Sequence, residues 1–426
     1  MRKNEENIFI KDIEVPAIVQ KKAGAAFSKI IMEGTDNMTN KNNQKVKTYE
    51  KTRYHFRSSA VAAACICILV MGSITAAAAA YHHWSRSMQG RLQATANQQN
   101  DLVNSGISTI LSEDTSYDSM QVTSGNVTIK PLEIIADGHF ALISFSIEGY
   151  ITDDMTERWT SPGFEKILVT DKNGGLDMSG GFYNGIVTGS DGKPVYDNGD
   201  LLEYDEYRNI IPHYMTEDGT MEFVMTIYKP NINDNILGDI IHIEFINLST
   251  MYQESEHAID GTWSIGFTNE LNSTWSFDIT LPEKNAAELY TLDAALGDTG
   301  ALVKSVELSP ISIKVSYDSS DFTGIAYQEK VTDSDGKETL STFYTEPPAF
   351  CGVRLEDGTL LTCITSAGMM GYTGLSHTEY YTLMSFNRII DTSRVDALLF
   401  MKYPPNEERP LIEDNLYIIP LSDSSK

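Results

Sequence analysis

The chain has 426 residues and a formal net charge of −27, with 59 Asp and Glu residues against 32 Lys and Arg residues. A body this acidic is unsuited to binding nucleic acid, whose phosphates are neutralised by Lys and Arg, or to lying on an anionic surface. The charge is also uneven, because residues 1–57 hold 12 basic and 7 acidic residues while the remainder holds 20 and 52. This asymmetry indicates that the two parts occupy different compartments.

The first expected element is an amphipathic helix within VPAIVQKKAGAAFSKIIME, near residues 15–32, where Pro16 suits the first helical position. One apolar face is formed by residues that recur at helical spacing: Val19, Ala23, Phe27 and Ile30. A single helix of this length cannot bury such a face alone. We expect the face to bind a partner or lie on the membrane surface, or the segment to stay partly disordered.

Residues 58–80, SSAVAAACICILVMGSITAAAAA, are uncharged and as a helix would reach roughly 34 Å, enough to span a hydrocarbon core of about 30 Å. Basic residues crowd the N-terminal flank, so the positive-inside rule places residues 1–57 in the cytoplasm and the C-terminal body outside. One alternative is a signal peptide cleaved near Ala80, where ITAAAAAY fits the A-x-A pattern. The long segment before the run favours an uncleaved anchor over that signal and over a buried globular helix.

Residues 81–120 are predicted to form a juxtamembrane stalk, helical or irregular, because SRSMQGRLQATANQQNDLV is polar and free of Pro. From about residue 121, apolar and polar residues alternate, which predicts strands with one buried face. The predicted inward positions on four such strands are Ala141, Ile143, Phe145 and Ile147; Met221, Phe223, Met225 and Ile227; Ile241, Ile243 and Phe245; and Trp275, Phe277, Ile279 and Leu281.

Asp-Gly occurs six times, at 137–138, 191–192, 218–219, 260–261, 335–336 and 357–358, and marks hairpin turns between such runs. We therefore predict a mainly β protein with two antiparallel, Ig-like β-sandwich domains, at 121–285 and 286–426. Residues 281–301 are expected to join them. The second domain takes its strands from VELSPISIKVSY, FCGVRL, LLTCIT, YYTLMSF, VDALLFM and LYIIPL.

Two cysteines lie in the predicted hairpin CGVRLEDGTLLTC. With Glu356–Gly358 as the loop, Leu355 opposes Thr359 and the same register places Cys351 opposite Cys363. A cross-strand disulfide is then allowed in an oxidising compartment. The alternative is two small, buried strand residues.

The layout resembles the membrane proteins of the domain of unknown function 4179 family. The resemblance rests on I-x-V-P-x-x-V in the tail, the Ala-rich anchor, VTIKPLEIIADGHFALISFSIEG, EDGTMEFVMTIY, GTWSIGF and VKSVELSPISIKVSY. It implies a Gram-positive single-pass protein often encoded beside an extracytoplasmic-function sigma factor and of anti-sigma type. No functional residue is carried over. A zinc-binding anti-sigma tail would need a His-x3-Cys-x2-Cys cluster, whereas residues 1–57 contain His55 and no Cys.

No catalytic motif is found, since H-E-x-x-H and G-x-S-x-G are both absent. DKNGGLD at Asp171 and DSDGKE at Asp333 resemble calcium-binding loops, but an EF-hand Glu is missing at the twelfth position, which favours ordinary turns. Trp159 and Trp263 could stack on sugars, whereas alternation assigns Trp275 to the core. We expect no enzyme, no cofactor and no metal.

The leading hypothesis is a single-pass regulator in the cell membrane, with an extracytoplasmic β-sandwich region that binds an unidentified ligand and a tail, residues 1–57, that binds a cytoplasmic sigma factor. The alternative is an envelope-associated binding or structural protein without a signalling role.

Overall fold

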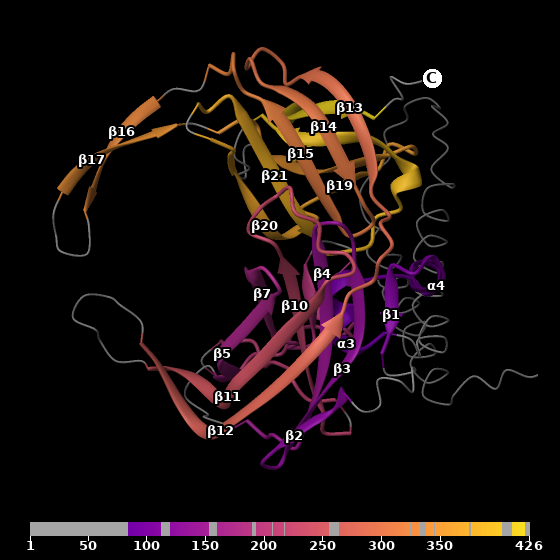
Figure 1. Cartoon of the computed structure of the whole chain (residues 1–426), viewed down its shortest axis with the longest axis vertical. Coiled ribbons are helices and arrows are strands. Elements are labelled where there is room, and N and C mark those ends of the chain that lie inside the picture. The colour runs from indigo at the N-terminus through magenta and orange to yellow at the C-terminus, as the bar shows by residue number, and fades with distance from the viewer. Residues whose placement is uncertain are drawn as a thin grey trace, which may run out of the picture. The chain divides into compact units, whose positions relative to one another are not determined.

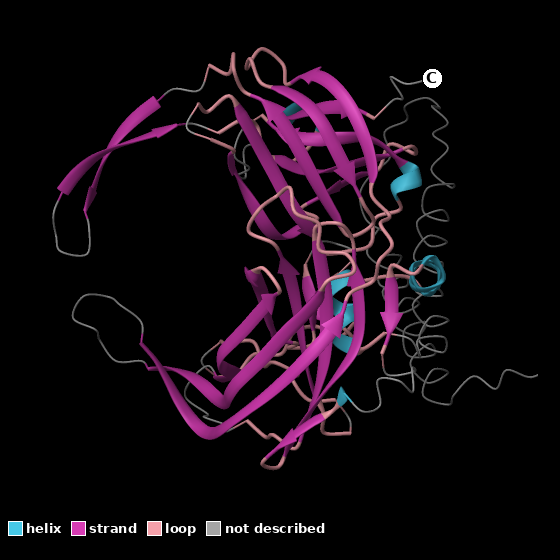
Figure 2. Cartoon of the chain, in the orientation of Figure 1, coloured by secondary structure: helices cyan, strands magenta, loops and turns pink. Residues whose placement is uncertain are grey.

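The computed structural model describes residues 84–421 except 112–119, 153–159, 190–192, 207, 217, 255–263, 324–325, 333–337, 345, 375 and 403–410. The chain divides into two compact units, Met1–Met71 and Gly72–Lys426, and every described residue belongs to the second. That part is mainly β, with several antiparallel sheets and few helices, as predicted (Figure 2). The expected tail helix and the apolar run 58–80 lie outside the described residues.

The first sheet contains six strands, in the order β1-β3-β4-β10-β7 with β2 paired to β3 (Figure 1). Their bounds are Ser108–Ile110 for β1, Val122–Ser124 for β2, Val127–Ala136 for β3, Phe140–Glu148 for β4, Asp177–Phe182 for β7 and Met221–Tyr228 for β10.

The second sheet has the order β12-β11-β5-β6. Its bounds are Thr160–Asp171 for β5, Gly174–Gly175 for β6, Ile240–Glu254 for β11 and Ser264–Thr280 for β12. One apolar core joins the two sheets in a sandwich-like arrangement, with Phe145 of β4 edge-to-face on Phe245 of β11 at 5.0 Å between ring centroids. Trp275 is fully buried there and donates its indole N–H to the Val127 carbonyl at 3.1 Å. All the predicted inward positions of these strands are buried in this core, as predicted.

The C-terminal half repeats this arrangement with its own core, which contains Val306, Tyr317, Val353 and Phe400. A five-stranded sheet has the order β13-β14-β15-β21-β20 and a four-stranded sheet the order β19-β18-β22-β23. The bounds are Glu288–Ala295 for β13, Leu302–Leu308 for β14, Ser312–Asp318 for β15, Phe350–Leu355 for β18, Leu360–Thr362 for β19, Thr365–Tyr372 for β20, Glu379–Phe386 for β21, Val395–Met401 for β22 and Leu416–Pro420 for β23.

Two further hairpins and two short helices complete the described chain. β8 (Ile186–Thr188) pairs with β9 (Pro194–Tyr196), and β16 (Ala326–Thr332) pairs with β17 (Glu338–Tyr344). Short 3-10 helices cover Thr392–Arg394 and Glu413–Asn415. The Asp-Gly dipeptides at 137–138, 218–219 and 357–358 lie between antiparallel partners, the second of them inside the Met215–Met221 bridge. The other three, at 191–192, 260–261 and 335–336, lie outside the described residues.

The predicted stalk is corrected. Residues 84–111 form α3 (Arg86–Leu92), α4 (Ala96–Ser105) and β1, and their apolar side chains Trp84, Met88, Leu92 and Leu102 are buried in a cluster shared with both halves. The few apolar residues of this polar segment hid its packing from the sequence pattern. Residues 281–301, expected to join the two domains, contain β13, which lies within the range predicted for the second domain and pairs with β14.

The α3–α4 segment also explains why β4 is buried on both faces. Alternation predicts one buried face, yet Phe140, Leu142, Ser144 and Ser146 are buried together with the inward residues. α3 lies against β4 and β10 on that second face. The outer face of the first sheet is therefore an internal surface, and polar groups on it need partners within the protein.

Candidate functional site

The candidate site lies where α3 begins, on the outer face of the first sheet. Glu133 of β3 and Glu222 of β10 lie on either side of β4, where they pair with Ser144 and Ser146 respectively. Glu133 is 1% exposed and Glu222 is 9% exposed. We call these two residues the carboxylate pair.

A β-bulge decides which way Glu133 faces. The pairing of β3 with β4 shifts between Pro131 and Glu133, so that Ile129 lies in the sandwich core before the shift and Ile134 after it. Because side chains alternate along a strand, the extra residue moves Glu133 from the core face to the α3 face.

The first residues of α3 supply the hydrogen bonds to the carboxylate pair. Ser85 donates its hydroxyl to Glu133 Oε1 at 2.5 Å and its backbone N–H to the same oxygen at 3.1 Å. The backbone N–H of Ser87 donates to Glu222 Oε2 at 2.5 Å. Ser85 also caps the helix, since its hydroxyl accepts from the Met88 N–H at 3.2 Å. The carboxylate pair thus fastens the start of α3 to the sheet.

Burial is the main influence on Glu133. It raises the pKa of Glu133 to about 7, and the nearby charge of Glu222 acts in the same direction, while hydrogen bonds from Ser85 and Ser144 oppose the shift. Among the ion pairs of the described residues, none joins a cation to Glu133 or Glu222.

The rest of α3 is held by apolar packing and by residues that follow β7 and β9. Met88 and Leu92 are fully buried, and the Leu92 carbonyl accepts from the Ile389 N–H of the C-terminal half at 3.0 Å. Arg86 forms an ion pair with Asp197 at 2.6 Å and lies over the Tyr183 ring. Movement of α3 would therefore disturb contacts with both halves.

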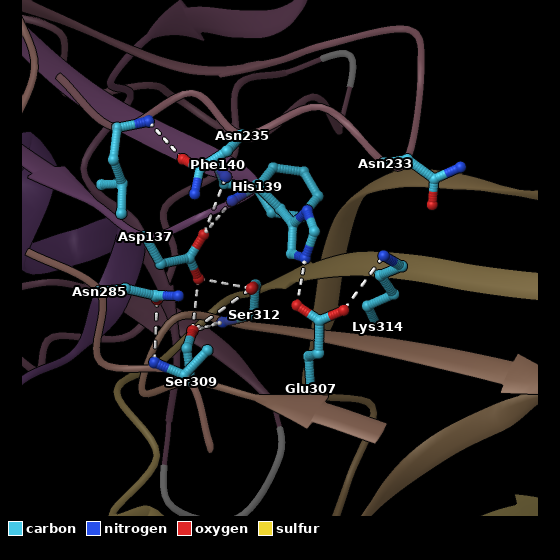
Figure 3. Close-up of polar contacts among 12 residues, drawn as sticks. Asp137, His139, Phe140, Asn233, Asn235, Asn285, Glu307, Ser309, Ser312 and Lys314 are labelled. Carbon is cyan, nitrogen blue, oxygen red and sulfur yellow. Dashed lines mark hydrogen bonds and ion pairs between the residues drawn. The ribbon is translucent and has the colours of Figure 1, made fainter. Parts of the chain in front are cut away.

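A second polar site, drawn in Figure 3, ties the β3–β4 turn to the β14–β15 turn. Asp137, 1% exposed, accepts the backbone N–H groups of His139 and Phe140 at 2.9 Å each on Oδ1. Its Oδ2 accepts the hydroxyls of Ser309 and of Ser312, the latter at 2.5 Å. This buried carboxylate is satisfied by four donors, two of them from the other half of the molecule.

An ion pair continues the same contact. His139 Nε2 lies 3.0 Å from Glu307 Oε2, and Lys314 Nζ lies 3.1 Å from Glu307 Oε1 across the β14–β15 pair (Figure 3). The hydrogen bond from His139 is the largest influence on Glu307 and, with the Lys314 charge, holds its pKa at about 2 against the opposing effect of burial.

The residues singled out in the sequence lie elsewhere or have other roles. Val19, Ala23, Phe27 and Ile30 are outside the described residues, as are Trp159, Trp263 and Asp333. Asp171 accepts the backbone N–H groups of Asn173 and Gly174 and forms an ion pair with the buried Lys229, as an ordinary turn residue does. Within the described ranges, no group of three His, Cys, Asp or Glu residues could hold a metal ion.

The cysteine hairpin has the predicted register. Arg354 pairs with Leu360, Gly358 has a φ of 83°, and the Cys363 N–H donates to the Cys351 carbonyl at 3.0 Å. Both thiols are free. Cys351 is buried, which raises the pKa of its thiol to about 12, whereas Cys363 is exposed.

The carboxylate pair and Asp137 were not singled out from the sequence. Glu222 interrupts the apolar run MEFVMTIY and Glu133 precedes IIA, so each is an acidic residue within a strand that is otherwise buried. That signal is available but weak, because an alternating strand normally presents such residues to solvent.

Comparisons with known proteins add little to this description. No protein-family model matches the chain, and no curated protein matches it. A crystal structure of a conserved domain protein from Bacillus anthracis is similar at a TM-score of 0.32 and 12% identity, over 73% of this chain and 88% of that one. In the described part of the chain no helix has both the length and the apolar character needed to cross a membrane.

Proposed function

We propose that the chain is a single-pass membrane regulator of the anti-sigma type, with residues 1–57 in the cytoplasm and the β-structured body, including two Ig-like domains, outside. The observation that carries the proposal is the uncharged run 58–80, which follows a basic segment and precedes an acidic body. The unburied apolar face of the expected tail helix supplies a surface for a cytoplasmic partner such as a sigma factor.

The attachment of α3 supports a signalling role. Ser85 follows Ala80, the last residue of the apolar run, by only five residues. The same Ser85 is hydrogen-bonded to Glu133, and Leu92 is bonded to Ile389 of the C-terminal half. A change in the external body would therefore act on the chain close to the membrane segment, provided that a ligand binds the two arrangements with different affinity.

The test is capture of the partner by the full-length chain in its native membrane. We expect a C-terminally tagged chain to co-purify the sigma factor encoded next to it, and Phe27→Asp with Ile30→Asp to reduce that capture at least about tenfold by placing charge on an apolar interface. Lys21→Asn, on the opposite helix face, is the matched control and should capture normally. Absence of any sigma factor, together with unchanged transcription after deletion of the gene, would exclude the regulator.

The alternative is an envelope-associated binding or structural protein, for which the tail serves only as an anchor. Exchange of residues 1–57 for an unrelated basic segment separates the two functions, because it abolishes regulation and leaves a purely external role intact. Protease treatment of intact cells checks the shared topology, since both functions require the C-terminal body to be cleaved from outside.

A further inference from the structure

Two carboxylates in the protein interior normally require cations or several hydrogen bonds, because each loses its hydration on burial. Glu133 and Glu222 share one buried surface, and each is fastened mainly to groups of the segment that begins at Ser85. We propose that the carboxylate pair is a proton-dependent attachment, which holds α3 on the sheet when the pair carries a proton and releases it when both carboxylates are ionised.

Among the described residues, no cation forms an ion pair with either carboxylate. From α3, Arg86 is engaged by Asp197, and Arg91 donates to Thr226 at 3.4 Å. From the loop after β7, Tyr183 donates to the same Asp197 at 3.2 Å. From β3, Lys130 pairs in register with Ser146, and the buried part of this face of β4 carries no charged residue, only Phe140, Leu142, Ser144 and Ser146.

Whether rising pH favours attachment or release of α3 depends on whether the carboxylates are buried or hydrated in each of the two states. With α3 attached, both side chains are buried and repel each other, so the attached state binds a proton more tightly than the released state, in which they are hydrated. Rising pH therefore favours release. The ordinary pKa of Glu133 is 4.5, and in the attached state it is raised to about 7, which sets the sensitive range between these two values and somewhat above.

The proposal goes beyond the regulatory function and does not depend on it, because it concerns only the external body. It is tested with the purified full-length chain by hydrogen–deuterium exchange of α3 between pH 5 and pH 8. Exchange in α4 serves as the internal reference for the intrinsic pH effect, since its one ionisable side chain, Asp101, is exposed.

We expect the ratio of α3 to α4 exchange to rise roughly 10- to 100-fold from pH 5 to pH 8. Glu133→Gln, a mimic of the protonated form, should abolish the rise and keep α3 protected. Glu148→Gln, an exposed carboxylate at the end of β4, is the matched control and should respond as the wild type does.

A ratio that does not change with pH in the wild type, or that rises equally in Glu133→Gln, would overturn the proposal. Should Glu133→Gln fail to fold, Glu222→Gln decides instead. Removal of the like charge eases ionisation of Glu133 in the attached state, so it should reduce the rise in α3 exchange between pH 5 and pH 8, and a rise equal to that of the wild type would again overturn the proposal. None of these measurements involves the tail or its partner, so failure here is distinguishable from failure of the regulatory function.

Discussion

The carboxylate pair and Asp137 are both buried acidic sites that join segments far apart in the chain, yet they are built differently. Asp137 receives four donors, two backbone N–H groups and two serine hydroxyls. Glu133 receives the hydroxyl and the backbone N–H of Ser85 and a hydrogen bond from the Ser144 side chain, and it lies near a second carboxylate. The two buried sites therefore differ in their donors and in their neighbouring charge.

The difference also assigns the two sites to different tasks. Asp137, Ser309 and Ser312 connect two turns that each belong to a sheet of a separate core, so they fix one half against the other. The carboxylate pair connects a sheet to a short helix at the start of the described chain. A contact that can be released is useful where the carboxylate pair holds α3. At Asp137 it would be harmful, because it would loosen one half against the other.

The largest expected effect is at Asp137. Asp137→Ala removes the acceptor of four donors in a buried position, and orphaned buried donors cost about 1–3 kcal/mol each before relaxation. We expect the free energy of unfolding to fall by about 3 kcal/mol, measured by urea denaturation of the purified full-length chain with tryptophan fluorescence.

Asp357→Ala is the matched control for this measurement, because Asp357 also occupies an Asp-Gly turn and accepts the Thr359 N–H, but it is exposed. It should leave stability nearly unchanged. If both substitutions lowered the free energy of unfolding equally, the hydrogen bonds of Asp137 to Ser309 and Ser312 would add no stability beyond that of the local turn.

Substitution of Glu133 should increase the stability of the protein at high pH, which is opposite in sign to the effect expected at Asp137. Its folded pKa of about 7 lies above the ordinary 4.5, so the wild type loses stability as pH rises from about 4.5 through 7. Glu133→Gln cannot ionise and escapes this loss. We expect the variant to match the wild type at pH 5 and to exceed it by as much as about 3 kcal/mol at pH 8. A variant less stable than the wild type at pH 8 would contradict the assignment.

Glu307 is a third acidic residue to compare with Asp137 and Glu133, and its pKa is lowered rather than raised. Its carboxylate contributes stability above pH 4.5 that is lost as pH falls towards about 2. Because the side chain is 31% exposed, solvent screening reduces the effect, and we expect Glu307→Gln to cost about 1 kcal/mol at pH 6. The cost should vanish near pH 2 in acid titration of stability. Glu270→Gln, at an exposed position of β12, should show no such dependence.

Strand faces and turns were predictable because both are local properties. Phe145, Phe245 and Trp275 follow from period-two alternation, and the register of the Cys351 hairpin follows from a three-residue loop with Gly at its left-handed position. These features require no knowledge of the rest of the chain.

The candidate site was not predictable because it depends on contacts between distant residues. Ser309 is 172 positions from Asp137, and Ser85 is 48 from Glu133, with no pattern that links them. The bulge after Pro131 also reverses the face on which Glu133 lies, which simple alternation cannot anticipate. The α3–α4 segment was predicted to be a stalk because its few buried apolar residues, among them Trp84, Met88, Leu92 and Leu102, lie in an otherwise polar sequence.

The smallest expected effect concerns the Arg86–Asp197 ion pair on the outer side of α3. It tests whether these neighbouring charged residues take part in the pH response of the carboxylate pair. Arg86 and Asp197 are 24% and 23% exposed, so their ion pair is screened by water, and Arg86→Ala should cost only about 0.5–1 kcal/mol. A double-mutant cycle with Asp197→Asn isolates the pair from the Arg86–Tyr183 contact. The coupling should be independent of pH between 5 and 8, a range that contains the ordinary pKa of neither aspartate nor arginine side chains. A coupling that weakened as pH rose would mean that Arg86 turns towards the ionised carboxylate pair, and the pH response would then belong to all four residues rather than to Glu133 and Glu222.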